Sequence, residues 1–440
     1  MAVIAASPRP KRIFFPDLIA HCPYPLRYNP HCEAASAESK VWLMSGCRLS
    51  KKKRAAFHGL KGGLLTAMVY PEADYDQFRV CCDWINYLFH LDNICDEMDD
   101  RTTVSTAGEI IGALRDPHGF RPASAVGRLT QSFWRRMSAT ASPGAQRRFI
   151  ETFELFFRAV AQQARDRASG NIPDLESYIA MRRDTSGCKP CWALIEYAND
   201  LDLPDWVMDH PCVRGLEEAA NDLVTWSNDI FSYNVEQSNG DTHNMIVVVQ
   251  AQEQLDLQSA VDYVGDLCLG CVDRFETLRA ALPSWGPQID DQLAVYVQGL
   301  GDWMIGNLVW SFETERYFGR SGRKGERRLA DLALGEGYRF LSHSAPSSDS
   351  LRSRLCGTLP RTRRPPTREK READLFVLCG ADTVVRGGLR DFGDASHSQL
   401  PSRGRVSFDA SSSSHRPPAI HTPWLLFPAL FIAATPRSIQ

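Results

Sequence analysis

The sequence has no apolar run long enough to cross a membrane. The longest apolar stretch near the C-terminus, WLLFPALFIAA (residues 424–434), has eleven residues and includes Pro428, whereas a spanning helix needs roughly 20 residues. The opening stretch, MAVIAASPRPKRIFFPDL, lacks the continuous apolar core that a secretory signal carries. We therefore expect no export signal, no membrane span and a cytoplasmic location.

A strong net charge is also missing, because 50 basic and 53 acidic residues leave a balance of −3. The balance is uneven, however, with −12 over residues 1–319 and +9 over residues 320–440. Stretches after Gly319 such as LPRTRRPPTREKRE and DASSSSHRPP bury too little apolar surface to offset chain entropy. We expect residues 320–440 to be a basic Ser/Arg/Pro-rich tail, mostly disordered. It is a solvated appendage, a segment that binds nucleic acid or acidic lipid, or the product of a misplaced exon boundary.

Strand-like alternation of apolar and polar residues is scarce, and there is no internal repeat. After an irregular, Pro-rich segment over residues 1–40, apolar residues recur at three- and four-residue spacing through most of residues 41–319. The pattern predicts long helices over 74–100, 144–168, 211–237, 255–282 and 289–318. Several of these segments are apolar on more than one side, which is typical of a large all-α bundle with a sizeable core.

Cysteine is plentiful, at 13 residues, and without an export signal these thiols are expected to be reduced. Two Cys-x-x-Cys pairs, Cys188 with Cys191 and Cys268 with Cys271, have the ligand type of a zinc site. The pairs lie 80 positions apart, which is much wider than a compact zinc module uses. We interpret them as core cysteines.

An acidic run, HLDNICDEMDD (residues 90–100), follows the apolar stretch WINYLF. Asp92, Asp96 and Asp100 are four residues apart and would share one face of a helix, where like charges repel. Either solvent or a bound divalent cation relieves that repulsion, and carboxylate oxygens suit Mg²⁺. The run is therefore a solvated helix end or a metal site.

A second row of oxygen atoms is predicted in NDIFSYNVE (residues 228–236). Asn228, Ser232 and Glu236 are four residues apart, so an amide, a hydroxyl and a carboxylate share a helix face that carries no cation. Neighbouring apolar residues indicate that this helix is largely buried, and buried polar groups need partners. Two such rows facing one cavity would hold Mg²⁺ ions that serve a phosphate group.

Phosphate binding also needs fixed cations, and two segments supply them. MRRDTSG contains Arg182 and Arg183 beside Gly187, where the backbone can bend, and SFETERYFG places Arg316 and Tyr317 at the end of the last long helix. An arginine grips phosphate oxygens with paired N–H groups, and a tyrosine hydroxyl adds a neutral donor. The alternative for each arginine is an ordinary salt bridge.

Together these motifs resemble those of class I terpene cyclases, specifically the fungal sesquiterpene synthases. DNICD (residues 92–96) resembles the aspartate-rich motif, although the overlapping DEMDD (residues 96–100) also fits. The resemblance favours the first register, which implies Asp92 and Asp96 as ligands and Asp99 and Asp100 as supporting charge. NDIFSYNVE matches the second metal motif in full, RRDTSG is similar to the diphosphate-sensor segment with Arg182 as the sensor, and ERYFG matches the terminal Arg-Tyr pair. The resemblance covers residues 41–319, whereas family members generally end soon after the Arg-Tyr pair.

The resemblance implies a helical bundle around a central active-site cavity and an enzyme that ionises and cyclises farnesyl diphosphate. Three Mg²⁺ ions would be held by Asp92, Asp96, Asn228, Ser232 and Glu236, and Arg182, Arg316 and Tyr317 would bind the diphosphate. An aromatic pocket would stabilise the carbocation; its candidate members are Trp84, Phe89, Trp226, Phe231, Trp303 and Trp310, with Phe89 and Trp310 preferred. The wording FHLDNICDEMDD is similar to a basidiomycete subgroup that forms delta(6)-protoilludene and other humulyl-derived products.

Other functions fit parts of the same pattern. A prenyl diphosphate synthase would use a similar helical cavity and Mg²⁺, but it would carry a second Asp-rich motif in place of NDIFSYNVE. A non-catalytic helical scaffold with a nucleic-acid-binding tail would show no Mg²⁺-dependent diphosphate binding. A protonation-initiated cyclase needs an Asp-x-Asp-Asp acid, which EMDD matches poorly. With the cyclase as our interpretation, we expect no nucleic-acid partner.

Overall fold

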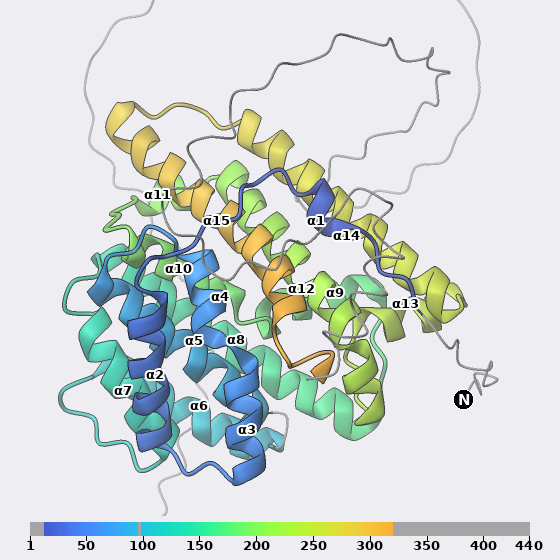
Figure 1. Ribbon diagram of the computed structural model, residues 1–440, viewed down its shortest axis with the longest axis horizontal. Coiled ribbons are helices and arrows are strands. Elements are labelled where there is room, and N and C mark those ends of the chain that lie inside the picture. Colours follow the sequence, from blue (N-terminus) through green and yellow to red (C-terminus); the bar gives the residue numbers. More distant parts are fainter. Residues whose placement is uncertain (1–12, 96–97, 320–440) are drawn as a thin grey trace, which may run out of the picture. The chain divides into compact units, whose positions relative to one another are not determined.

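The computed structural model describes residues 13–95 and 98–319, and within these ranges the chain forms helices and loops without a strand (Figure 1). The all-α prediction is therefore confirmed. The helices are α1 (Leu18–His21), α2 (Cys32–Gly46), α3 (Lys51–Leu60), α4 (Gly62–Val69), α5 (Tyr75–Cys95), α6 (Asp100–Arg115), α7 (Ala125–Met137), α8 (Pro143–Ser169), α9 (Leu175–Thr185), α10 (Cys188–Ala198), α11 (Asp205–Met208), α12 (Pro211–Ser238), α13 (Met245–Glu253), α14 (Leu257–Ala280) and α15 (Pro287–Glu313).

Two of the long helices, α8 and α14, begin at residues that favour a helix start. The Ser142 hydroxyl caps the amino end of α8 by accepting from Ala145 N, Pro143 occupies its first turn, and Gly170 ends it in the left-handed region at φ 66°. The side chain of Asp256 caps α14 in the same way. Helices α8, α12 and α14 lie within two residues of their predicted bounds.

Two predicted helices are too long. The segment predicted as one helix over 74–100 breaks, because α5 ends at Cys95 and α6 begins at Asp100. Asp99 caps α6, since its Oδ1 accepts from Thr102 N at 2.8 Å. The last long helix ends at Glu313, where Thr314 turns extended and donates its hydroxyl to Leu60 O at 2.9 Å. The chain beyond it, with Arg316 and Tyr317, therefore lies outside the helix.

At the amino end, α2 begins at Cys32, before the boundary predicted at residue 40. The segment predicted to be irregular over 1–40 thus contains α1 and the first turns of α2 where the structure describes it. The predicted tail, residues 320–440, lies outside the described residues. No helix in the described part of the chain is both long enough and apolar enough to span a bilayer.

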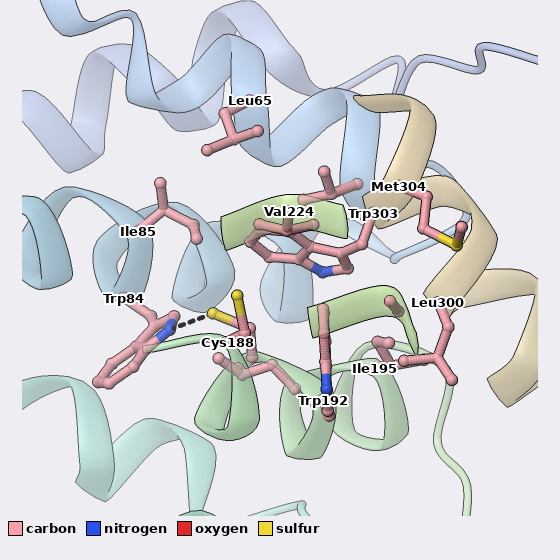
Figure 2. Close-up of a cluster of buried hydrophobic side chains, with 14 of the residues drawn as sticks. Leu65, Trp84, Ile85, Cys188, Trp192, Ile195, Val224, Leu300, Trp303 and Met304 are labelled. Carbon is pink, nitrogen blue, oxygen red and sulfur yellow. Dashed lines mark hydrogen bonds between the residues drawn. The ribbon is translucent and has the colours of Figure 1, made fainter. Parts of the chain in front are cut away.

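Two short helices form the centre of the bundle. Nearly all residues of α4 and α10 are buried; α4 packs against α2, α5 and α15, while α10 packs against α5, α8, α9, α12 and α15. Figure 2 shows the core around α10, where Trp84, Trp192 and Trp303 surround Cys188 and Ile195. The four Cys-x-x-Cys cysteines are buried, as expected for core cysteines. These inner helices form the floor beneath the cavity described next.

Candidate active site

A cavity of about 1030 Å³ lies between α3, α5, α8, α9, α12 and the segment after α15. A narrower pocket of about 110 Å³ adjoins it and shares several of its lining residues. The shared residues are Phe89, Asp92, Phe156, Arg182, Thr185, Asn228, Arg316 and Tyr317. The inner pocket adds buried apolar side chains, among them Leu65, Val224, Trp303 and Trp310. A polar outer chamber therefore leads to an apolar floor.

Asn228, Ser232 and Glu236 of α12 all line the outer chamber, one helical turn apart. Asn228 donates from Nδ2 to the Tyr317 hydroxyl at 2.6 Å. Glu236 Oε2 accepts from Asn244 Nδ2 at 2.9 Å. Ser232 is buried, and its Oγ makes no hydrogen bond of ordinary geometry within the described residues. The row predicted from the spacing is present, and one of its oxygens lacks a full partner.

The electrostatic environment of Glu236 favours a nearby cation. Burial, followed by the charge of Asp229, raises the pKa of the Glu236 carboxyl to about 7. The hydrogen bond from Asn244 and the charge of Arg182 oppose that shift only in part. A positive ion beside Glu236 would stabilise its charged form.

Arg182 faces the cavity and is held in a buried network. Its Nε and Nη2 donate to Asp229 Oδ1 at 3.0 and 2.8 Å, and Nη2 also donates to Asn228 Oδ1 at 3.0 Å. Tyr178 donates its hydroxyl to Asp229 Oδ2 at 2.5 Å. Burial alone would lower the pKa of Arg182, but the charge of Asp229 outweighs it and the pKa is raised. The guanidinium is thus a permanent positive charge at the junction of both chambers.

The neighbouring Arg183 points elsewhere. Its Nε and Nη2 bind the two carboxylate oxygens of Asp222 at 2.8 and 2.7 Å, and its Nη1 lies 3.1 Å from Glu218. It lines neither chamber. Gly187, which the sequence marks as a bend, adopts φ 70° between α9 and α10. Of the two arginines, the structure places Arg182 in position to contact a ligand.

Arg316 and Tyr317 close the cavity from the segment after α15. Arg316 Nη2 donates to Asp92 Oδ2 at 2.9 Å, and its guanidinium carbon lies 5.2 Å from the centre of the Phe89 ring. Burial raises the pKa of Tyr317 to about 12, so its hydroxyl stays neutral. The pair therefore provides one charged and one neutral donor on the same rim of the cavity. The hydrogen bond between Asn228 and the Tyr317 hydroxyl joins this rim to the α12 row.

The acidic run divides into parts with different roles. Asp92, on the last turn of α5, lines both chambers. Asp96 lies outside the described residues. Asp99 is the exposed cap of α6, and Asp100 is exposed in its first turn. The expectation that Asp92 and Asp100 share a helix face is wrong, because the helix breaks between them.

Of the six aromatic side chains predicted for the pocket, Phe89, Trp303 and Trp310 line the inner chamber. The other three line neither chamber. Trp84 packs against Phe149 and Phe153 in the core and donates to Cys191 Sγ. Phe231 packs on the back of α12 against other aromatic rings, and Trp226 is buried outside both chambers.

Several residues that support the site were missed by the sequence analysis. Asp229 and Tyr178 hold Arg182, and Asn244 binds both Glu236 and the Asp229 backbone carbonyl, the latter at 2.8 Å. Asp229 sits inside NDIFSYNVE as a charged residue in an apolar helix, which was a usable signal. Tyr178 was not marked because its partner Asp229 is 51 positions away, and Asn244 was not marked because its contacts depend on how the chain turns between α12 and α13.

The oxygen set fits a hard divalent cation. Among residues 13–95 and 98–319, no group of three or more His, Cys, Asp or Glu side chains could hold a metal ion. The α12 wall of the cavity offers a cation an amide, a hydroxyl and a carboxylate, from Asn228, Ser232 and Glu236. Such an ion would give the buried Ser232 Oγ a partner, and it would stabilise the negative charge of the buried Glu236 carboxylate.

An all-helical bundle with these groups around one cavity is the architecture of a terpene synthase. The family model "Terpene synthase family 2, C-terminal metal binding" matches residues 83–274, a span that contains Asp92, Arg182 and the α12 row. Germacradien-4-ol synthase from Streptomyces citricolor has a similar structure, with a TM-score of 0.58, 25% identity, and coverage of 66% of this chain and 96% of that one. The protein accordingly uses a divalent metal.

Curated relatives narrow the family. Sesquiterpene synthase 2 of Postia placenta is 65% identical over 319 residues, covering 72% of this chain and 94% of the relative. An alpha-muurolene synthase of Coprinopsis cinerea is 52% identical, over 73% and 78% of the two chains. A delta(6)-protoilludene synthase of Stereum hirsutum is more distant, at 39% over 72% and 86%. The chain belongs to the sesquiterpene synthases and is a terpene cyclase, a lyase whose substrate is a prenyl diphosphate.

Proposed function

We propose that this cyclase takes farnesyl diphosphate, ionises it with Mg²⁺ and releases diphosphate and a cyclic sesquiterpene. The observation that carries the proposal is the cavity itself. One wall has an oxygen row with an incompletely bonded hydroxyl at Ser232, the rim has Arg182, Arg316 and Tyr317, and the floor is apolar. Such a site separates a charged leaving group from a hydrocarbon chain.

The Mg²⁺ ligands we propose are Asp92 on α5 and Asn228, Ser232 and Glu236 on α12, with Asp96 as a further ligand and three ions in total. Mg²⁺ prefers oxygen ligands, keeps several waters and commonly completes its shell with phosphate oxygens. When bound, it would neutralise the charge that develops on the leaving diphosphate. The α12 residues would also keep Tyr317 in place, since Asn228 already bonds its hydroxyl.

Arg182, Arg316 and Tyr317 would bind the diphosphate through N–H and O–H donors. As the bond between C1 and the bridging oxygen breaks, its electron pair leaves with the diphosphate, and the two guanidinium groups stabilise the added negative charge. The network of Asp229 and Tyr178 fixes Arg182 before substrate arrives, so little reorganisation is needed at that step. The allylic cation remains in the inner chamber.

The inner chamber is suited to that cation. Phe89, Trp303 and Trp310 present aromatic rings there, and aromatic faces attract positive charge. Phe89 and Trp310 lie with ring centroids 5.4 Å apart, below the Arg316 rim. Apolar walls exclude water, which would otherwise quench the cation to an alcohol. The pocket thereby favours ring closure and final loss of a proton.

The product is a cyclic sesquiterpene whose skeleton depends on the shape of the inner chamber. The predicted humulyl-derived product has delta(6)-protoilludene as its example. It is supported by the sequence of the acidic run, FHLDNICDEMDD, and by a relative at 39% identity. An alpha-muurolene-type product is the second candidate, because the relative with that name is more similar, at 52%.

The test is incubation of the purified full-length chain with farnesyl diphosphate and Mg²⁺, with products identified by gas chromatography and mass spectrometry. We expect hydrocarbon or terpene alcohol in the presence of Mg²⁺ and none after chelation. Folded protein that forms no terpene product would refute the proposal. Elongated prenyl diphosphates as the only products would instead support a prenyl diphosphate synthase.

A further inference from the structure

One face of α3 lines the outer chamber. Lys52, Lys53, Ala56, Gly59 and Leu60 lie on this face at three- and four-residue spacing, and all line the cavity. Lys51 and Arg54, the outer members of the same KKKR run, do not line it. The charge run is therefore divided by helix geometry into two residues that face the cavity and two that do not.

The carboxyl end of this face is joined to the segment that carries Arg316. Glu315 N donates to Gly59 O at 2.8 Å, and the Thr314 hydroxyl donates to Leu60 O at 2.9 Å. Trp310 Nε1, from the last turn of α15, donates to Leu60 O at 3.0 Å. These bonds hold α3 and the Arg316–Tyr317 rim as one unit, so the position of the α3 face is set by the diphosphate rim itself.

The amino end of this face lines the same chamber as the end of α5. His90, two residues before Asp92, lines the same chamber as Lys53. The two lysines thus line a chamber that Arg167, Arg182 and Arg316 also line from other segments.

We propose that Lys52 and Lys53 form a further cationic group of the diphosphate site, supplied by α3. This inference rests on the proposed function, and it extends that site beyond the Arg-Tyr pair and Arg182. Each lysine offers an ammonium group with three donors on a flexible stem, which suits the freely rotating non-bridging oxygens of a diphosphate. The stem allows the ammonium to follow the leaving group as it separates from the hydrocarbon.

The competing interpretation is an exposed, solvated charge run that attracts anions only through its general field. All four members of the run are exposed, so neutralising any of them should leave the fold intact. A general field would depend equally on the four charges, because they occupy one helical turn. A binding role would depend on the two cavity-facing charges alone, and this difference makes the two interpretations separable.

The experiment compares two double variants of the full-length chain, Lys52→Gln/Lys53→Gln and Lys51→Gln/Arg54→Gln, which remove the same charge from the same turn. Binding of inorganic diphosphate in the presence of Mg²⁺ is measured by titration calorimetry, together with KM for farnesyl diphosphate. We expect the first variant to weaken diphosphate binding by about tenfold or more and to raise KM. The second should change both by less than about twofold. Lys52→Arg/Lys53→Arg should restore most of the binding.

Equal effects in the two double variants would overturn the assignment of the lysines while leaving the proposed function intact. Wild-type protein that neither binds diphosphate with Mg²⁺ nor turns over farnesyl diphosphate would overturn both. Wild-type turnover together with a selective loss in the cavity-facing variant supports both.

Discussion

Arg316 and Asp92 bind each other across the mouth of the cavity, with Nη2 of the arginine 2.9 Å from Oδ2 of the aspartate. They come from chain segments 224 positions apart, the end of α5 and the loop after α15. We propose that Arg316 binds the diphosphate and that Asp92 binds a metal ion. A bound diphosphate would offer Arg316 new acceptors, and a bound cation would offer Asp92 a new partner. Binding of diphosphate and cation together would therefore replace the hydrogen bond between Arg316 and Asp92.

The register of the acidic run can be tested by comparing Asp92→Asn with Asp100→Asn. Asp92 lines both chambers, so its neutralisation should lower turnover of farnesyl diphosphate by about a hundredfold. Asp100 is exposed on a separate helix and should tolerate the change within about twofold. Steady-state kinetics at saturating Mg²⁺ measures both. Greater damage from Asp100→Asn would show that the 96–100 register binds the metal.

Ser232→Ala separates a metal ligand from a structural hydroxyl. Because Ser232 Oγ makes no ordinary hydrogen bond, its loss should leave the free energy of unfolding unchanged or slightly higher. Turnover should nevertheless fall by about tenfold or more, with a higher Mg²⁺ concentration needed for half-maximal rate. Denaturant unfolding and Mg²⁺ titrations provide the two measurements. The matched control on α12 is Ser227→Ala, which removes a hydroxyl that donates to Val224 O. An unstable Ser232→Ala protein would contradict the metal role.

The buried Arg182–Asp229 pair should be costly to break. Asp229→Asn leaves the Arg182 guanidinium in a buried site with a neutral partner, and such losses typically cost about 3 kcal/mol or more of unfolding free energy. Asp209→Asn breaks an exposed pair with Arg214 and should cost less than about 1 kcal/mol. Urea unfolding of the two variants measures the difference. Equal, small effects would mean that the network does not hold Arg182.

Glu217 lies outside the active site, and its ionisation should make the free energy of unfolding fall as pH rises. Burial raises its carboxyl pKa to about 7 from 4.5, although Tyr296 donates to it at 2.5 Å. The folded protein therefore retains a proton that the unfolded chain loses. The stabilisation is fully present below pH 4.5 and is lost as pH rises through about 7. Because Glu217 is partly exposed, we expect about 1–2 kcal/mol.

Glu217→Gln should reduce that pH dependence to the part that Glu236 contributes, and should stabilise the protein at pH 8 relative to wild type. Unfolding free energies at pH 5.5 and pH 8 give the slope for each protein. The control is Glu253→Gln, an exposed glutamate on α13 whose loss should leave the slope unchanged. A wild-type slope that persists in Glu217→Gln would assign the effect to another group.

Spacing predicted the site where the relevant residues lie on one helix. Asn228, Ser232 and Glu236 share a face of α12 because a period of 3.6 residues requires it. The choice between Arg182 and Arg183 could not be made in this way, since adjacent residues point in different directions and the orientation of α9 is set by tertiary contacts. Spacing also could not show which way the Trp84 side chain points, because Trp84 lies on a helix that is buried on several sides.

The missed helix break shows a different cause. Asp99 is a favoured capping residue, and that signal was visible in DEMDD, but the regular four-residue spacing of the carboxylates suggested a continuous helix. The contact of Thr314 with Leu60 depends on how segments 254 positions apart pack, and the contact of Asn244 with Glu236 depends on the turn that joins α12 to α13. Residue spacing predicts neither contact, although they fix the Arg316 rim and the α12 row.

The central claim is that the α12 row enables Mg²⁺-dependent ionisation of farnesyl diphosphate. The most direct measurement is diphosphate release by full-length wild type and by the Asn228→Ala/Ser232→Ala/Glu236→Gln variant, with folding of each checked by circular dichroism. We predict that the wild type releases diphosphate in step with sesquiterpene formation, and that the folded variant releases none above the uncatalysed background. Comparable Mg²⁺-dependent release by the folded variant would contradict the account.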